Sequence, residues 1–171
     1  MAKLHEYQSK ALLQAAKIKT PASRLVTTAA EAHQAVAELG AVVIKAQAWT
    51  TSRAAQGLVQ FATTPQQAEQ IAGDLLGRKV GNFQIEQLLV EEQVDIAREF
   101  YVGLIVDDRN RAPVLIFSSV GGSGVEEIAQ QHPEKIAQHV VDISTGLRDY
   151  QARDLLIRAG VERDLLNKLT G

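Results

Sequence analysis

The sequence predicts an α+β fold, in which hairpin strands combine with amphipathic helices. Apolar residues recur at helical spacing over residues 4–18 and indicate a first helix, which Pro21 follows. Apolar, β-branched runs such as "AVVIKAQA" have the length and composition of strands. The polar turn "DDRNRAP" joins two such runs and is too short for a parallel crossover. A purely parallel, doubly wound sheet is therefore not expected.

Two helices carry clear start signals. Thr28 and Glu31 have the spacing of a capping box, and Gly40 stands where the helix that they begin should end. Thr64 and Gln67 repeat this pattern, with a proline at the first helical position. Three more helices are expected at residues 125–132, 149–160 and 162–169, and strands at 24–27, 41–48, 57–62, 87–94, 98–107, 114–120 and 137–143.

Composition limits the classes of function. The chain has 171 residues, of which 46% are hydrophobic and 22% charged, as in one globular domain or two small lobes. A net charge of -2 and a pI near 6.1 provide no field that would attract nucleic acid or an anionic membrane. Without cysteine, disulfide and thiolate chemistry are excluded. No apolar run approaches the roughly 18 residues of a membrane span, so we expect a cytoplasmic protein, or one inside an organelle.

Two cations are candidates for binding an anion. Lys45 lies at the end of an apolar strand, where an ammonium can be held against an anionic ligand, and Arg53 follows in a polar loop. The alternative for Lys45 is an edge-strand lysine whose stem covers apolar surface and whose ammonium reaches water. The residues alone favour this alternative.

The segment "SSVGGSG" is a second anion candidate. Gly121 and Gly122 leave backbone N–H groups uncovered, and Ser118 and Ser119 add hydroxyls shortly before an expected helix start. A flexible connection between strand and helix explains the same residues equally well.

The acidic residues Glu91, Glu92, Asp95 and Glu99 gather where two strands join. They could bind a ribose hydroxyl or a hydrated cation, or form the solvated end of a hairpin. The histidines show no metal-ligand spacing, so we expect surface or packing roles for all of them and predict no metal site. They are His5, His33, His132 and His139.

Several segments together resemble one family. "LHEYQSKALL", "VVIKAQ", "LLVEEQVDIAREFYVGLIVD", "SSVGG" with "VEEIA", and "STGLRDYQARDLLIRAG" follow the order and spacing of the N-terminal part of the succinyl-CoA synthetase β subunit family. The malate–CoA ligase β subunit and ATP citrate lyase are related to it. The resemblance extends from Leu4 to the last residues of the chain.

This resemblance implies an ATP-grasp fold, in which two α+β lobes hold a nucleotide and Mg²⁺ between their sheets. The lobes would comprise residues 20–92 and 93–171, with the first helix at 4–18. In this family, an acid is joined to CoA with ATP or GTP through an acyl phosphate, and a histidine of the partner α subunit carries the phosphoryl group. None of the histidines of this chain is therefore expected to be catalytic.

The resemblance also implies roles for particular residues. Lys45 corresponds to a lysine that contacts the nucleotide phosphates, and Arg53 to the arginine of a glycine-rich loop. Glu91 corresponds to the segment between the lobes that meets the adenine, where Val94 would offer its backbone. Glu99 corresponds to a glutamate near the ribose. Cations at phosphates and a carboxylate at a sugar are chemically reasonable pairings.

The chain departs from the family pattern in two respects. Ser52 and Ala54 flank Arg53 where the family has glycines, and only Gly57 of the loop glycines is kept. Side chains there limit how closely backbone amides approach a phosphate. The magnesium ligands and the CoA-ligase domain of the family lie beyond residue 171, so we expect an incomplete ATP-grasp fold that is inactive alone.

The leading interpretation is the ATP-grasp portion of the β subunit of an acid–CoA ligase, present as a fragment. The first alternative is a relative that binds a nucleotide or a protein partner without catalysis. A lobe that keeps the fold and has lost its ligand is the third interpretation.

Overall fold

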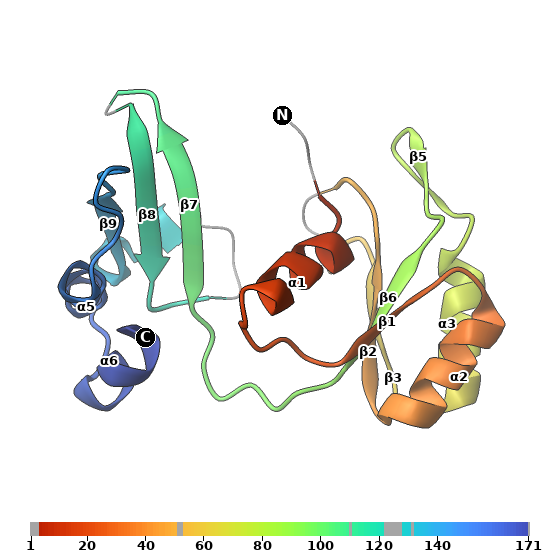
Figure 1. Cartoon of the computed structure of the whole chain (residues 1–171). Coiled ribbons are helices and arrows are strands. Elements are labelled where there is room, and N and C mark those ends of the chain that lie inside the picture. The colour runs from red at the N-terminus through yellow and green to blue at the C-terminus, as the bar shows by residue number, and fades with distance from the viewer. Residues whose placement is uncertain (1–3, 51–52, 110, 122–127, 131, 171) are drawn as a thin grey trace. The chain divides into compact units, whose positions relative to one another are not determined.

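A computed structural model describes residues 4–50, 53–109, 111–121, 128–130 and 132–170. The chain divides into two compact units, Met1–Asp95 and Ile96–Gly171 (Figure 1). Each unit has its own sheet and its own helices, and each is described by itself. In the described part of the chain, no helix is long and apolar enough to cross a membrane.

The first unit is built on a four-stranded antiparallel sheet in the order β1-β6-β2-β3. Strand β6 comes last in the sequence of this unit, yet it lies between β1 and β2. Strand β2 is consequently paired on both sides, so the interpretation of Lys45 as an edge-strand residue is wrong. The strands are β1 (Ser23–Val26), β2 (Val42–Ala46), β3 (Val59–Ala62) and β6 (Leu88–Glu92).

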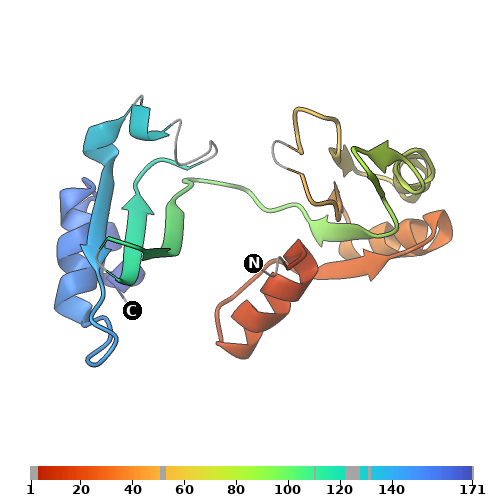
Figure 2. The same ribbon diagram turned by 90° about the horizontal axis from the view of Figure 1, so that it is seen from above.

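Helices cover both faces of this sheet (Figures 1 and 2). Helices α2 (Ala29–Leu39) and α3 (Pro65–Leu75) pack against one face and enclose the main core. Helix α1 (Glu6–Ala15) lies on the opposite face. Every second residue of β2 belongs to the core, including Ile44, which is fully buried. The residues between them must therefore face α1.

Both predicted helix starts are confirmed. The Thr28 hydroxyl accepts a hydrogen bond from the Glu31 amide at 3.2 Å, and the Glu31 carboxylate accepts one from the Thr27 amide at 2.7 Å. At α3, the Thr64 hydroxyl and the Gln67 side chain make the equivalent contacts, the latter at 2.9 Å from the preceding threonine amide. These contacts satisfy amides that the first turn of a helix leaves unpaired.

One small hairpin was not predicted. Strands β4 (Lys79–Val80) and β5 (Phe83–Gln84) pair around a turn in which Gly81 has φ of 58°. Strands of two residues are too short to show an alternating pattern in the sequence.

The second unit has a three-stranded antiparallel sheet in the order β7-β8-β9. The hairpin predicted around "DDRNRAP" is confirmed, because β7 and β8 pair along their whole lengths. Phe117 and Ala137 of this sheet form a second core with Leu155, Leu156 and neighbouring residues of the last two helices. The elements are β7 (Tyr101–Asp107), β8 (Ala112–Ser118), the 3-10 turn η1 (Pro133–Lys135), β9 (Ile136–Val140), α5 (Asp149–Arg158) and α6 (Arg163–Thr170).

Within the helix expected at residues 125–132, residues 128–130 are helical, and residues 125–127 and 131 lie outside the described residues. The later helices are confirmed with bounds that differ by a few residues from the prediction, since helix ends are poorly specified by local pattern. Most of the observed strands are shorter than the strands expected from the apolar runs.

Candidate functional site

Strand alternation brings two charged residues of the first unit together on the face covered by α1. Lys45 of β2 lies opposite Leu89 of β6, and Glu91 lies two residues further along β6. Residues two apart in a strand share a face, so Lys45 and Glu91 are diagonal neighbours. Ile44, Ala46 and Val90, which adjoin them in sequence, point into the core on the other face.

Five charged side chains form one network on this face. The Lys45 ammonium lies 2.7 Å from Glu91 Oε1 and 2.8 Å from Glu6 Oε1. The other oxygen of Glu6 lies 2.7 Å from the Arg53 guanidinium. The other oxygen of Glu91 pairs with Lys10. The charges alternate in sign along the series Arg53, Glu6, Lys45, Glu91, Lys10, and the network carries a net charge of +1.

Helix α1 supplies two members of the network. Glu6 is its first residue, and Lys10 follows one turn later on the same side of the helix. The Lys10 ammonium also donates to the Pro21 carbonyl at 2.9 Å, and its side chain is 10% exposed. Charged groups so well shielded from water require partners, and each one here has them. The network therefore joins α1 to the sheet.

The charges of the network move two pKa values in opposite directions. Burial alone would raise the pKa of Glu6, but hydrogen bonds and charges from Lys45 and Arg53 outweigh it and lower that pKa. Burial alone would lower the pKa of Lys45, but Glu6 and Glu91 outweigh it and raise that pKa. Glu6 and Lys45 are therefore both charged at neutral pH.

The loop that carries Arg53 turns at Gly57. Its φ is 67°, a conformation that favours glycine, and its amide donates to the Ala54 carbonyl at 3.0 Å. The Leu58 amide donates to the Arg53 carbonyl at 2.9 Å. Neither Ala54 nor Ala55 has a positive φ, so the alanines that stand where glycines were expected impose no backbone strain.

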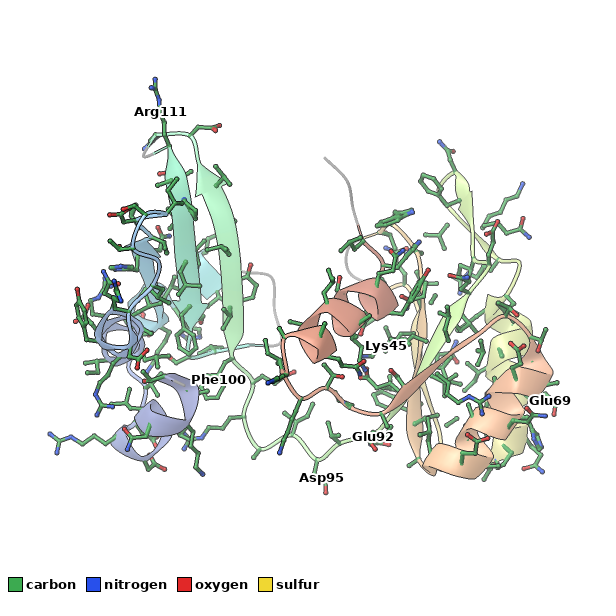
Figure 3. All side chains as sticks on the ribbon, viewed as in Figure 1. Lys45, Glu69, Glu92, Asp95, Phe100 and Arg111 are labelled. Carbon is green, nitrogen blue, oxygen red and sulfur yellow. The ribbon has the colours of Figure 1, made fainter. Side chains whose placement is uncertain are left out.

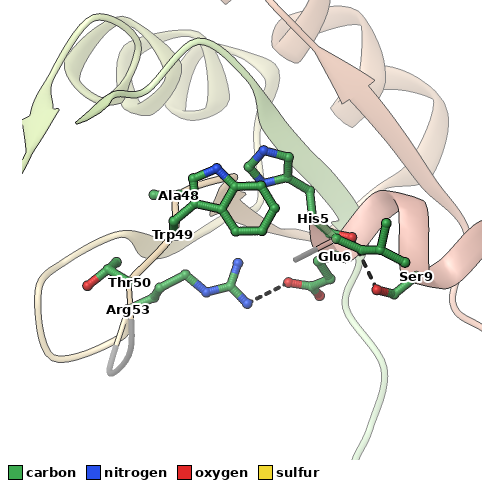
Figure 4. Close-up of a pocket in the computed structure, with 8 residues that line it drawn as sticks. His5, Glu6, Ser9, Ala48, Trp49, Thr50 and Arg53 are labelled. Atoms are coloured by element: carbon green, nitrogen blue, oxygen red, sulfur yellow. Dashed lines mark hydrogen bonds and ion pairs between the residues drawn. The ribbon is translucent and has the colours of Figure 1, made fainter. Parts of the chain in front are cut away.

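Arg53 and Glu6 line a pocket of about 440 Å³ (Figure 4). The Trp49 ring forms one wall and stacks on the His5 ring, with 4.0 Å between ring centroids and 29° between planes. A second hollow of about 330 Å³ lies beside Trp49 and His5, and its lining includes the amide side chains of Gln47, Asn82, Gln84 and Gln87. Burial, followed by the charge of Arg53, lowers the pKa of His5. Its imidazole is thus neutral at neutral pH.

Sequence reasoning gave neither His5 nor Trp49 a place in the site. The expectation that His5 has a packing role is consistent with its stack on Trp49, but its position at the pocket was missed. One feature of the sequence could have revealed the pocket: Trp49 stands in a polar loop between Lys45 and Arg53. A large aromatic ring rarely occupies such a loop without a packing partner.

The family model of the ATP-grasp domain matches residues 3–171. The chain belongs to the ATP-grasp family. The predicted ATP-grasp fold is therefore confirmed.

Curated relatives narrow the similarity within the ATP-grasp family. The chain is 42% identical, over 95% of its length, to the ADP-forming succinate–CoA ligase subunit β of Halorubrum lacusprofundi, of which it covers 43%. It is 40% identical, over 97% of its length, to the GDP-forming succinate–CoA ligase subunit β of Thermus thermophilus, of which it covers 44%. The chain thus spans less than half the length of these relatives.

Solved structures show the same fold. The dinucleotide forming acetyl-coenzyme A synthetase 1 of Ca. Korarchaeum cryptofilum, in complex with coenzyme A and Ca-AMPCP, matches 95% of this chain and 68% of its own, with a TM-score of 0.74 and 21% identity. ATP citrate lyase from Methanothrix soehngenii matches 91% of this chain and 42% of its own, with a TM-score of 0.62 and 21% identity.

The other ATP-grasp site residues expected from the sequence are not members of the charge network. Val94 is 48% exposed and follows the end of β6, and Glu99 is exposed in the second unit. Asp95, which is labelled in Figure 3 together with Lys45, ends the first unit. The base and ribose roles of Val94 and Glu99 stay predictions. Ser52 and Gly122 lie outside the described residues.

The segment before the expected phosphate loop of the second unit is engaged with the protein itself. The Ser118 hydroxyl is fully buried and accepts from the Val120 amide at 3.1 Å, and the Ser119 hydroxyl donates to the Ala159 carbonyl at 2.6 Å. A Cβ at Gly121 would lie 2.7 Å from Glu99 Cβ. Close packing therefore explains Gly121, and its phosphate role stays a prediction.

The acidic residues around the strand join do not gather into a cation site. Glu91 faces Lys10 and Lys45, so its carboxylate is already neutralised by two ammonium groups. Over the residues that the structure describes, no group of three or more histidine, aspartate and glutamate side chains could hold a metal ion. The described side chains thus do not fit a resident Mg²⁺.

Proposed function

We propose that the chain is the nucleotide-binding portion of the β subunit of an acid–CoA ligase, and that Lys45 and Arg53 bind the phosphates of ATP or GTP. One observation carries this proposal. An ammonium and a guanidinium are bridged by a single carboxylate, that of Glu6, at the edge of an open pocket in a chain of the ATP-grasp family. Phosphate oxygens are the ligands that such a pair of cations suits.

The network assigns a different task to each residue. Arg53 presents five N–H donors in a planar fork and uses two of its nitrogens for Glu6 and for the Ala46 carbonyl. Lys45 has three donors, of which Glu6 and Glu91 take two. Glu91, which is 8% exposed, fixes the Lys45 ammonium in position. The cations neutralise phosphate charge, and Glu91 holds one of them rigidly.

The complete reaction is proposed for the intact protein. The curated relatives are named as succinate–CoA ligase β subunits. By that likeness, the intact protein forms succinyl-CoA or a related acyl-CoA from acid, CoA and nucleotide together with an α subunit in the cytoplasm. Mg²⁺ would enter with the nucleotide and neutralise its phosphates. We expect no acid activation from these 171 residues alone.

Titration with ATP tests nucleotide binding directly. Trp49 is the only tryptophan and lies at the pocket, so its fluorescence reports on the site, and calorimetry measures the affinity. The variant Arg53→Gln should weaken binding about tenfold through loss of one charge-assisted contact. Its matched control is Arg24→Gln, which removes an exposed arginine that pairs with Glu38 at 2.8 Å.

The control should bind ATP as the natural chain does. Equal affinity of the natural chain and Arg53→Gln would remove Arg53 from the site. Absence of any heat or fluorescence change on addition of ATP, with folded protein, would contradict nucleotide binding by this chain.

A further inference from the structure

We propose that Glu6 is an internal competitor for the phosphate ligand, which makes the site selective for polyanions over monoanions. This inference rests on the proposed function only in taking Lys45 and Arg53 as the ligand-binding cations. Glu6 places one oxygen 2.8 Å from the Lys45 ammonium and the other 2.7 Å from the Arg53 guanidinium. A bridging phosphate would use its oxygens in the same way.

Charge counting explains the selectivity. Three cations and two carboxylates leave the network with a net charge of +1, and Glu6 neutralises one of the two positive charges of Lys45 and Arg53. A monoanion that displaced Glu6 would exchange one negative charge for another and gain little. A triphosphate brings several charges and oxygens, so it can replace the carboxylate and still attract the remaining positive charge.

Glu6 is the carboxylate of the network that is placed to move. Its side chain is 24% exposed and lines the pocket, whereas that of Glu91 is 10% exposed and held by two ammonium groups. Glu6 is also the first residue of α1, where the helix dipole stabilises a negative charge. A displaced Glu6 carboxylate therefore reaches water and remains in a favourable field.

The release of Glu6 should be visible at the neighbouring residue. His5 precedes α1 directly and stacks on Trp49 at 4.0 Å between ring centroids. Loss of the contacts of Glu6 with the loop frees the start of α1, and the stack on Trp49 changes with it. The fluorescence of Trp49 thus reports both on ligand and on the position of α1.

The test compares Glu6→Gln with the natural chain, using inorganic triphosphate, ATP and acetate as probes. Glutamine keeps the shape of the side chain and removes its charge, so we expect triphosphate to bind about tenfold tighter by calorimetry. Acetate should bind to the variant and not measurably to the natural chain. The matched control Glu38→Gln removes a carboxylate from an exposed pair in the same unit and should leave both affinities unchanged.

Unchanged or weaker binding of triphosphate by Glu6→Gln would overturn the inference, because Glu6 would then position the cations and not compete for them. If Glu6→Gln does not fold, Glu6→Asp replaces it. Its shorter side chain cannot span both cations, so it too should bind triphosphate more tightly, and failure to do so would overturn the inference.

Failure of the proposed function is distinguishable from failure of this inference. Tighter triphosphate binding by Glu6→Gln, without ATP binding by the natural chain, would support the internal competitor and contradict the nucleotide site. ATP binding by the natural chain, with no tighter triphosphate binding by Glu6→Gln, would support the nucleotide site and contradict the internal competitor.

Discussion

Replacement of Lys10 by methionine should destabilise the first unit by about 2–3 kcal/mol. Removing one partner of a buried ion pair costs roughly 3–5 kcal/mol when the other charge is left alone. Glu91 is not left alone here, because Lys45 still lies 2.7 Å from its other oxygen, so the cost should fall below that range. Loss of the hydrogen bond to the Pro21 carbonyl, at 2.9 Å, contributes about 1 kcal/mol of this total.

Urea denaturation followed by Trp49 fluorescence measures this loss, since the only tryptophan lies in the first unit. Adding Glu91→Gln to Lys10→Met removes the carboxylate charge of Glu91, which has lost one of its two ammonium partners. The double variant should therefore be more stable than the sum of the single effects predicts, by about 1 kcal/mol. The control Arg24→Met removes one partner of an exposed ion pair and should change the free energy of unfolding by at most about 0.5 kcal/mol.

A change below about 0.5 kcal/mol for Lys10→Met, with an unchanged dependence on urea, would refute the reasoning. It would mean that the network does not hold α1 to the sheet.

Four further predictions concern single residues. Because the pKa of Glu6 is lowered, the ionised Glu6 stabilises the folded chain fully above the ordinary pKa of 4.5, and this contribution is lost as the pH falls through the lowered pKa. In Glu6→Gln, the free energy of unfolding should therefore depend less steeply on pH below 4.5. Gly57→Ala, at φ of 67° and with open space around the new Cβ, should cost about 1 kcal/mol of backbone strain in urea denaturation. Gly121→Ala would bring a Cβ within 2.9 Å of the Glu99 carbonyl carbon, so faster amide hydrogen exchange is expected in β8, and unchanged exchange would contradict the packing role. Strand β7 lies at an edge of its sheet and leaves Leu104 66% exposed, so it could pair with a second copy of the chain; Leu104→Lys should then leave the fold intact and lower the fraction of dimer in sedimentation velocity, and an equal fraction in both proteins would contradict pairing through β7.

Local pattern predicted the helices better than the sheet. Thr28 and Thr64 begin their helices through hydrogen bonds to residues three positions later, and this spacing is visible in the sequence. The insertion of β6 between β1 and β2 depends on pairing between segments more than 40 residues apart, such as Val43 with Glu91. No local signal specifies such a partner, although the apolar run of β6 correctly marked it as a strand.

The same distinction applies to the site. The sequence marked Lys45 and Arg53 as candidate cations, and the structure brings both to one carboxylate. That carboxylate belongs to Glu6, 39 residues before Lys45, and its role emerges only when α1 packs on the sheet. Likewise, the sequence favoured a Lys45 whose ammonium reaches water. That interpretation was wrong because helix α1 covers this face of the sheet.

The starts of α2 and α3 have the same contacts but differ in one ionisable residue. Glu31 and Gln67 occupy the same position and accept from the preceding threonine amide at 2.7 and 2.9 Å. The Glu31 carboxylate can take up a proton in acid, whereas the Gln67 carboxamide cannot. Hydrogen bonds from Thr27 lower the pKa of Glu31, so acid must work against those bonds before it weakens the start of α2, whereas it leaves the start of α3 untouched. Two helices on the same sheet therefore differ in acid tolerance because one carboxylate oxygen of Glu31 is replaced by an NH2 group in Gln67.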